Sequence, residues 1–149
     1  MSTTILITVL SGVLTYVVGQ IILKLVIEPV QDTKKTIGEV SHSLIEYGQA
    51  IHNPGLLPGE AMHEAANQLR KLSSKLHAHL YLVPYYSRTA KIFGLPEKAK
   101  LLVASTDLVA LSTSLYKVYE KTYEQNAKRH ERICDSLSIY MAEDDRWPK

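Results

Sequence analysis

Several residue types are scarce in this chain of 149 residues, which has one cysteine, one phenylalanine, one tryptophan, six prolines and seven glycines. A single cysteine excludes an intrachain disulfide and is compatible with a reducing compartment. The scarcity of glycine and proline argues against an all-β fold and favours helices. Neither sign of charge dominates, because 17 basic and 15 acidic residues are interleaved, so the composition does not indicate a nucleic-acid-binding protein. We therefore expect an all-α protein with one domain.

The N-terminal part of the chain has no charged side chain before Lys24. We predict a transmembrane helix over Ile5–Ile27, which would be about 34 Å long at about 1.5 Å per residue. The hydrocarbon core of a bilayer is about 30 Å thick, so this segment is long enough to span it with some tilt. A cleaved signal peptide is the alternative. The segment has no basic start, its apolar run is too long, and no small-x-small cleavage site follows it.

The residues on the two sides of this segment predict its orientation. The first residues, MSTT, carry no charged side chain, whereas Lys24, Lys34 and Lys35 follow on the other side. Because basic residues favour the cytoplasmic side, we expect the N-terminus outside and the rest of the chain in the cytoplasm. The expected organisation is a transmembrane helix at residues 1–28, a cytoplasmic helical bundle at residues 29–142 and a polar tail at residues 143–149.

The predicted membrane helix carries hydroxyl groups along one face. Four hydroxyl residues recur at spacings of four, three and four: Thr4, Thr8, Ser11 and Thr15. Gly12 and Gly19 lie beside this stripe. One interpretation is helix–helix packing in a homo-oligomer, because small residues let helices approach closely in lipid. The other is a pore whose water-filled lumen is lined by the hydroxyls.

Helical periodicity continues beyond the membrane segment. An apolar seam at alternating a and d positions predicts a helix that continues through Pro29 with a kink: Val30, Ile37, Val40, Leu44, Tyr47 and Ile51. A loop is expected at residues 52–59, where two Pro-Gly pairs occur.

Three more helical segments follow the loop. A helix from Glu60 to near Pro84 is predicted by the stripe Ala65, Leu69, Leu72, Leu76, His79 and Val83. A short helix over Tyr85–Phe93 should stop at Gly94. The longest helix should have Pro96 in its first turn and run to about Gln125, with the stripe Leu101, Ala104, Leu108, Leu111, Leu115 and Val118. Residues 126–140 are helix-like, the tail at 143–149 should be loose, and the soluble part should form an up-down bundle.

Most of the chemically interesting residue patterns favour structural roles. Glu39-x-x-His42 and Glu60-x-x-His63 have a spacing that di-iron proteins use, but both pairs fall away from the apolar seams and would face solvent. No metal site or cofactor is therefore expected. His79 lies on an apolar stripe, so we expect it to be partly buried and hydrogen-bonded. Cys134 has no neighbouring acid or histidine pattern that indicates a nucleophile.

Arg70 and His77 form the one pattern with a catalytic precedent. The segment Arg70-Lys-Leu-Ser-Ser-Lys-Leu-His77 resembles the Arg-x(4–6)-His motif of the helical nuclease family called HEPN. In that family the pair meets across a dimer, where histidine assists proton transfer and arginine stabilises phosphate charge. The family usually has Asn, Asp or His directly after the arginine, whereas this chain has Lys71. The alternative is an exposed basic helix face.

One membrane helix, a helical bundle and this Arg–His pair together resemble the small HEPN-like membrane accessory proteins of type VI-B CRISPR loci. The resemblance implies an oligomeric pore that compromises the bacterial inner membrane during phage infection, without enzymatic activity. It also implies a CRISPR effector, an RNA-guided RNA nuclease, as partner. Our leading hypothesis is thus a homo-oligomeric, pore-forming single-pass membrane protein. The alternatives are a membrane-tethered ribonuclease acting on RNA through Arg70 and His77, and a non-enzymatic membrane anchor or adaptor.

Overall fold

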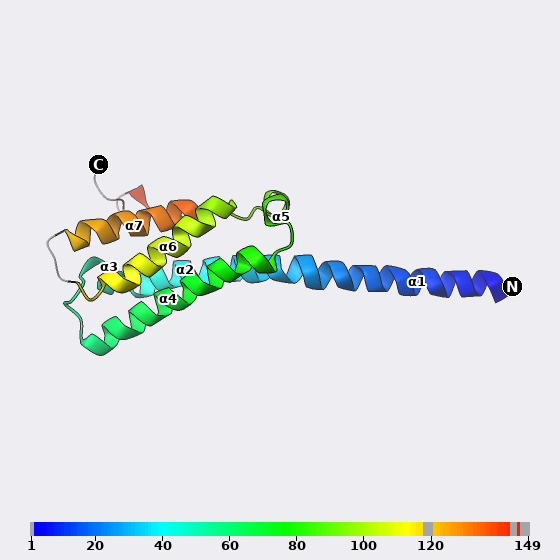
Figure 1. Ribbon diagram of the computed structural model, residues 1–149, viewed down its shortest axis with the longest axis horizontal. Helices are drawn as coiled ribbons and strands as arrows, with labels where there is room; N and C mark the ends of the chain where they lie inside the picture. Colours follow the sequence, from blue (N-terminus) through cyan, green and yellow to red (C-terminus); the bar gives the residue numbers. More distant parts are fainter. Residues whose placement is uncertain (1, 118–120, 144–145, 147–149) are drawn as a thin grey trace.

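The computed structural model describes residues 2–117, 121–143 and 146 (Figure 1). Within these residues the chain forms helices joined by turns and contains no strand, as the composition predicts. One long apolar helix projects from a group of packed helices (Figure 1). We call the packed helices, from Val30 to Met141, the helical body.

The projecting helix begins before the predicted start and does not end at Ile27. Helix α1 spans Ser2–Ile22, a π-helical segment η1 spans Leu23–Ile27, and α2 follows directly over Glu28–Glu46. The stretch Thr3–Glu46 is the one helix in the described residues that is long and apolar enough to cross a membrane, with a best window of mean hydropathy 2.1 and no residue of that window buried. The predicted membrane segment is therefore the outer part of a longer rod.

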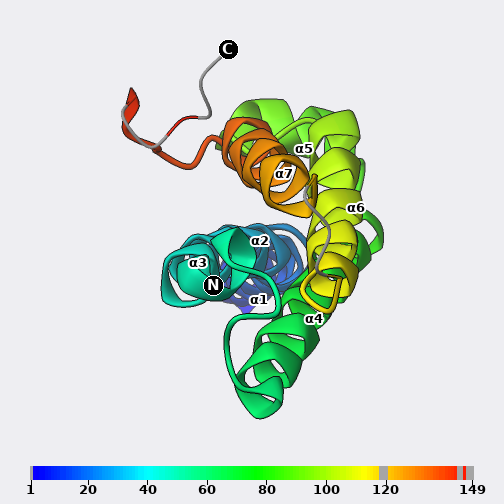
Figure 2. The same ribbon diagram turned by 90° about the vertical axis from the view of Figure 1, so that its left-hand side faces the viewer.

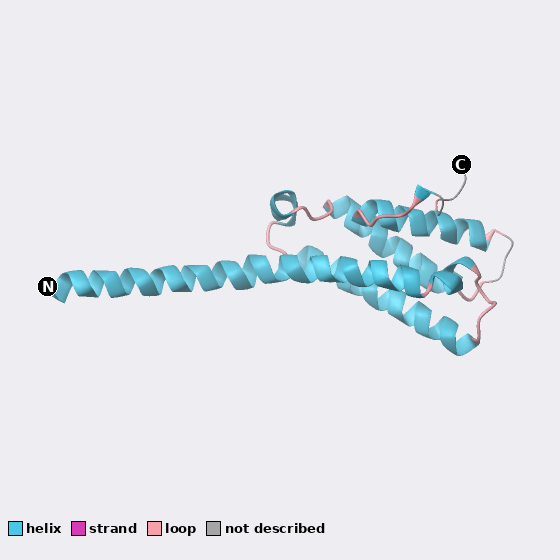
Figure 3. Cartoon of the chain, turned by 180° about the vertical axis from the view of Figure 1, so that it is seen from behind, coloured by secondary structure: helices cyan, strands magenta, loops and turns pink. Residues whose placement is uncertain are grey.

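The predicted kink at Pro29 is replaced by the π-helical segment. The backbone N–H of Glu28 donates to the carbonyl of Leu23, five residues earlier, so the turn before Pro29 is wider than an α-helical turn. A proline ring crowds the carbonyl four residues before it and removes one N–H donor. We infer that the wider turn accommodates the ring, and the rod continues without a break (Figure 3).

The helix after Pro29 is shorter than the apolar seam. Helix α2 ends at Glu46 and a separate short helix, α3, spans Gly48–His52, with Tyr47 at φ −97° and ψ 14° between them. The break lies at Tyr47, and Gly48, a weak helix former, is the first residue of α3. The seam itself is confirmed, because four of its members are buried and two pack on the core: Val30, Val40, Leu44 and Ile51, then Ile37 and Tyr47.

Helices α4 and α5 agree closely with expectation. Helix α4 spans Gly59–Leu82 after the predicted loop, and every member of its predicted stripe is buried, including His79. Helix α5 spans Tyr86–Phe93 and stops at Gly94, whose φ of 67° favours glycine. Tyr85 precedes α5 in the same left-handed region, with φ 47°.

The prediction of one longest helix from Pro96 to Gln125 is wrong. Helix α6 spans Lys98–Ser114, is shorter than α4, and has Glu97 as its N-cap. Pro96 lies before the helix, and its carbonyl accepts a 2.9 Å hydrogen bond from the Tyr86 hydroxyl. Helix α7 spans Thr122–Leu137. The described stripe residues of α6 are all buried, and Val118 lies outside the described residues.

Four helices surround the core of the body. Helix α6 packs between α4 and α7, and α2 contacts both α4 and α7 (Figure 2). The α4–α6 contact is close because Ser73 and Ser105 face each other there, and the Ser73 hydroxyl donates to the Ser105 carbonyl at 2.8 Å. The largest fully buried side chains are leucines and isoleucines, together with Val40 and Asn126.

Two buried polar links fix α7 to the rest of the body. The Asn126 side chain is fully buried, accepts from the Ser114 hydroxyl at 2.6 Å and donates to the Ile51 carbonyl at 3.0 Å. Arg132 forms a two-point ion pair with the buried carboxylate of Asp107, at 2.6 and 2.8 Å. In the tail, Arg146 pairs with two acids of α7, so the expectation of a loose tail is wrong at this residue.

Candidate functional site

Three of the four stripe hydroxyls of α1 are bonded to their own helix. The Thr8 hydroxyl donates to the Thr4 carbonyl, Ser11 to the Thr8 carbonyl and Thr15 to the Ser11 carbonyl, each at 2.9 Å. A hydroxyl that donates within its helix needs no outside acceptor, so these groups can lie in a bilayer without an unsatisfied proton. Each oxygen keeps a lone pair that can accept from water or from another helix.

Gly12 and Gly19 have no neighbour that requires them to be glycine. A Cβ built at either residue meets no atom within 4 Å. Glycine inside a helix is unfavourable by about 1 kcal/mol relative to alanine, and no contact within one chain requires it at these two positions. Gly38, Gly48 and Gly59 in the helical body have equally open surroundings. Close approach of a second helix would use Gly12 and Gly19, because small residues let helix backbones come together in lipid.

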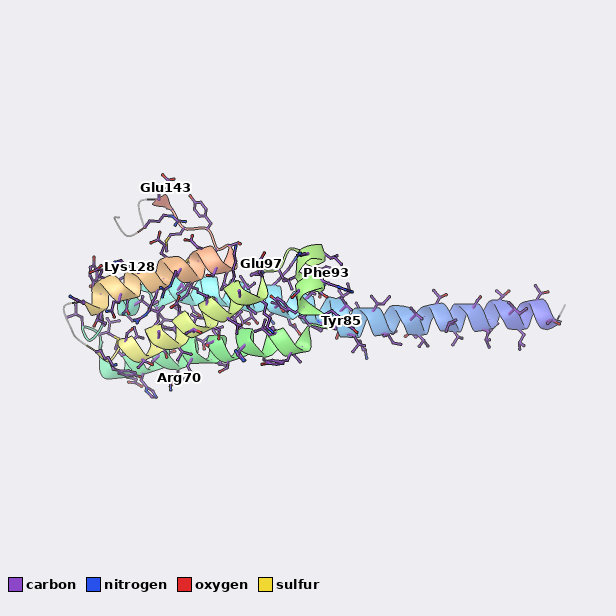
Figure 4. All side chains as sticks on the ribbon, turned by 45° about the horizontal axis from the view of Figure 1, so that its top comes forward. Arg70, Tyr85, Phe93, Glu97, Lys128 and Glu143 are labelled. Carbon is purple, nitrogen blue, oxygen red and sulfur yellow. The ribbon has the colours of Figure 1, made fainter. Side chains whose placement is uncertain are left out.

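Arg70 and His77 are both exposed on α4, two turns apart, and Figure 4 labels Arg70 on the outer side of the helix. The ring of His77 lies 5.7 Å from the ring of Tyr81, centroid to centroid. Among the described residues no hydrogen bond or ion pair joins Arg70 to His77, so within one chain they do not converge on a common point. A second chain would have to supply the other half of a nuclease site.

The two Glu-x-x-His pairs have other partners. Glu39 forms an ion pair of 2.7 Å with Lys75, and this hydrogen bond lowers the pKa of its carboxyl. His42 lies 3.5 Å from Glu46, and His63 bonds to the hydroxyl of Tyr116 at 3.1 Å. Across the described part of the chain, no three His, Cys, Asp or Glu side chains gather as metal ligands would.

A buried histidine between α2 and α4 is the polar feature with the most unusual surroundings. Nε2 of His79 bonds to the Thr36 hydroxyl at 2.9 Å, whereas Nδ1 is buried without a hydrogen-bond partner among the described residues. Burial lowers the pKa of His79, and Lys75 adds to this, while Asp32 and Glu39 oppose it. The sequence predicted the burial from the stripe on α4, but nothing in the sequence indicated Thr36 as the partner.

A second histidine contact lies at a surface pocket on the other side of α2. Nε2 of His52 is 3.1 Å from Nδ1 of His130, and both rings line a pocket of about 450 Å³ with Cys134 and the segment 139–142. Burial raises the pKa of the Cys134 thiol to about 11, so it is a poor nucleophile at neutral pH. The thiol of Cys134 is therefore not an activated nucleophile in this pocket.

No protein-family model matches the chain, and no match was found among curated proteins or solved structures. Any role for the hydroxyl stripe or for the Arg–His pair must consequently be inferred from the geometry alone. That geometry distinguishes them, because the α1 face carries features that one chain does not explain, while Arg70 and His77 are ordinary exposed side chains.

Proposed function

We propose that this protein is a single-pass membrane protein whose α1 helices assemble into a homo-oligomer and make the bilayer permeable. The face that meets in the oligomer consists of the hydroxyl stripe and the glycines beside it: Thr4, Thr8, Ser11, Gly12, Thr15 and Gly19. In this proposal the helical body is a cytoplasmic bundle and the N-terminus lies outside, because Lys24, Lys34 and Lys35 follow the apolar segment.

The observation that carries the proposal is the combination of bonded hydroxyls and unexplained glycines on one face of an unburied helix. The hydroxyls donate within the helix, which allows them to face lipid in the monomer. Their free lone pairs give an oligomer a polar lumen or a polar helix contact. The open space beside Gly12 and Gly19 allows the close approach that either arrangement needs.

The test measures dye release from liposomes that contain the purified full-length protein. Thr8→Leu with Ser11→Leu replaces two stripe hydroxyls, and Val9→Leu with Val13→Leu introduces the same two leucines on the far side of α1 without removing a hydroxyl. We expect wild type and the valine variant to release dye and the stripe variant to release far less. Equal release by both variants would contradict a pore lined by the stripe.

The size of the assembly in mild detergent gives a second, independent measurement. A large closed oligomer supports a pore. A monomer contradicts the proposal and supports a simple anchor or adaptor. A dimer that cuts RNA contradicts it as well and supports the ribonuclease alternative, which requires Arg70 and His77 from two chains.

A further inference from the structure

Helix α5 lies at the end of the helical body from which the apolar rod emerges. Figures 1 and 3 show α5 end-on while the rod runs across the view, and Figure 4 shows α5 from its side, crossing the direction of α1. If α1 crosses a bilayer, α5 consequently lies along the bilayer surface and close to it. The loop after α5 also lies against the start of α2, where Gly94 and Leu95 share a pocket with Lys34 and Ile37.

Large apolar side chains around α5 are exposed to a degree that the core does not explain. Tyr81 is 79% exposed, Leu82 59%, Tyr85 84% and Ile92 77%. Isolated exposed apolar residues are common, but these four lie within residues 81–92, and Tyr81 and Tyr85 line one pocket. We take the four as one apolar patch, a feature that indicates an interaction surface. Tyrosine beside aliphatic side chains is the composition found where a protein meets the headgroup level of a membrane.

Basic side chains accompany this patch. Arg88 and Lys91 are exposed on α5, one turn apart, and no carboxylate lies within ion-pair distance of either in the described part of the chain. Arg88 also lines a pocket of about 600 Å³ together with Lys98 and Tyr85. Glu97 is an acidic neighbour, in the loop after α5. We call the six residues Tyr81, Leu82, Tyr85, Arg88, Lys91 and Ile92 the α5 face.

The backbone at Tyr85 supports the same interpretation. Tyr85 is not glycine, yet its φ is 47° and ψ 47°, in the left-handed region that is unfavourable for a bulky side chain. The residue is 84% exposed, so packing inside the chain does not compensate for this conformation. Strained conformations of this kind concentrate at functional surfaces.

We propose that the α5 face binds the surface of an anionic bilayer, with its apolar side chains at the acyl boundary and Arg88 and Lys91 at lipid phosphates. This inference rests on the proposed membrane anchoring by α1. The occupant is lipid rather than a second copy because the face combines apolar and basic groups, lies crosswise to the rod and sits beside its exit point. Glu97 beside Lys91 supplies one acidic group against the two basic groups of the α5 face, so the surface keeps a net positive charge that suits anionic lipid better than a second copy of itself.

The first test places a tryptophan on the face and measures quenching by brominated lipids. Ile92→Trp and Ile45→Trp are compared in a Trp147→Phe background, in vesicles of phosphatidylcholine and phosphatidylglycerol. The two isoleucines are matched, at 77% and 79% exposed, and Ile45 lies at the end of α2 far from α1. We expect strong quenching of the tryptophan emission in the Ile92→Trp variant and little in the Ile45→Trp variant. Equal quenching of the two would overturn the proposal.

A third position separates this inference from the proposed function. Leu10→Trp reports on α1 itself. Quenching at position 10 without quenching at position 92 means that α1 is in the bilayer and the α5 face is not, which overturns this inference alone. Absence of quenching at position 10 overturns the membrane anchoring and, with it, this inference.

The second test reverses charge on the face. Arg88→Glu with Lys91→Glu is compared with Lys117→Glu and Lys121→Glu, which make the same change in charge. Lys117 follows the end of α6 and Lys121 is the N-cap of α7, and these helix ends lie at the other end of the body from α5 (Figure 1). We expect the α5 pair to reduce quenching at position 92 at least about twofold in phosphatidylglycerol vesicles, since each basic group contributes to anionic binding. The control pair should leave it unchanged. Equal effects of the two pairs would overturn the electrostatic part of the proposal. Quenching at position 92 that depends on contacts between copies, detected by cross-linking, and not on phosphatidylglycerol would overturn lipid as the occupant.

Discussion

Thr36 on α2 and His79 on α4 share a buried hydrogen bond of 2.9 Å between Oγ1 and Nε2, beside a ring nitrogen that has no hydrogen-bond partner in the described residues. The bond ties α2, the inner part of the rod, to α4. A protonated ring would place a charge next to apolar side chains, and burial therefore holds the pKa of His79 below 6.5.

Acidification should weaken the body through His79. The unfolded chain takes up a proton near pH 6.5 and the folded chain only at lower pH, so the free energy of unfolding falls as the pH drops below about 6.5. Urea unfolding in detergent micelles at pH 7.5 and 5.5 measures this, above the range in which carboxylates titrate. We expect a lower midpoint at pH 5.5 for wild type and for His42→Gln, which changes an exposed histidine. His79→Leu should lose most of the difference, and a full difference in this variant would contradict the assignment.

The ion pair between Asp107 and Arg132 should stabilise the α6–α7 contact. The Asp107 side chain is 8% exposed, so removal of the guanidinium leaves a buried carboxylate with two fewer hydrogen bonds. Arg132 is itself 59% exposed and solvent screens the pair, so we expect Arg132→Gln to lower the free energy of unfolding by about 1–2 kcal/mol. Lys128→Gln breaks the exposed Lys128–Glu124 pair and should change stability within error. Chemical unfolding of both variants decides the point.

Cys134 should react slowly with thiol reagents in the folded protein. The residue is 2% exposed and its pKa is raised to about 11, chiefly by burial, so both access and thiolate fraction are low at pH 8. We expect maleimide labelling to be at least about tenfold slower in mild detergent than in denaturant. Ser87→Cys in a Cys134→Ser background supplies an exposed reference thiol. Rapid labelling of native Cys134 at the reference rate would show that the α7 core is open.

His77 should be dispensable for permeabilisation. Its ring is exposed and packs on Tyr81, far from the α1 face, so we expect His77→Ala to release dye from liposomes as wild type does. We also expect the purified protein to leave RNA uncut. RNA cleavage by wild type that His77→Ala abolishes would replace the pore proposal with the nuclease alternative.

Replacing the two residues with positive φ by glycine should distinguish an effect on stability from an effect on membrane binding. Tyr85 and Ser138 both have positive φ, at 47° and 58°, and glycine relieves roughly 1 kcal/mol of left-handed strain at such positions, partly offset by its unfolded-state entropy. We expect neither Tyr85→Gly nor Ser138→Gly to lower the thermal midpoint. Only Tyr85→Gly should weaken quenching at position 92, and an equal effect of both variants would contradict a role for the tyrosine ring.

The apolar patterns of this sequence were sufficient to predict most helices and their buried faces. The stripes on α2, α4 and α6 identified core residues correctly, because burial on one helix face leaves a regular spacing. The loop before α4 and the stop at Gly94 were also correct, since glycine and proline mark such positions directly.

The predictions of helix ends fail where no residue in the sequence marks the end, or where the marking residue is compatible with two structures. No glycine or proline lies between Ser114 and Asn126, so the apolar stripe could not reveal that α6 ends at Ser114. It also could not reveal that Asn126, on the next helix, hydrogen-bonds to Ser114. A proline can lie in the first turn of a helix or just before the helix. The hydrogen bond from the Tyr86 hydroxyl to the Pro96 carbonyl favours the second position, which spacing alone does not reveal. The π-helical turn before Pro29 forms because the backbone widens to accommodate the proline ring, and the spacing of apolar residues does not predict this.

The unbroken passage from α1 through η1 into α2 has a mechanical consequence. The rod Thr3–Glu46 contains 44 residues. At 1.5 Å per residue it is about 66 Å long, so a change of about 10° in its tilt moves the inner end sideways by roughly 11 Å. In the proposed membrane assembly, a spanning helix can accommodate a thinner bilayer by tilting further, and each helical body should then swing relative to its neighbours.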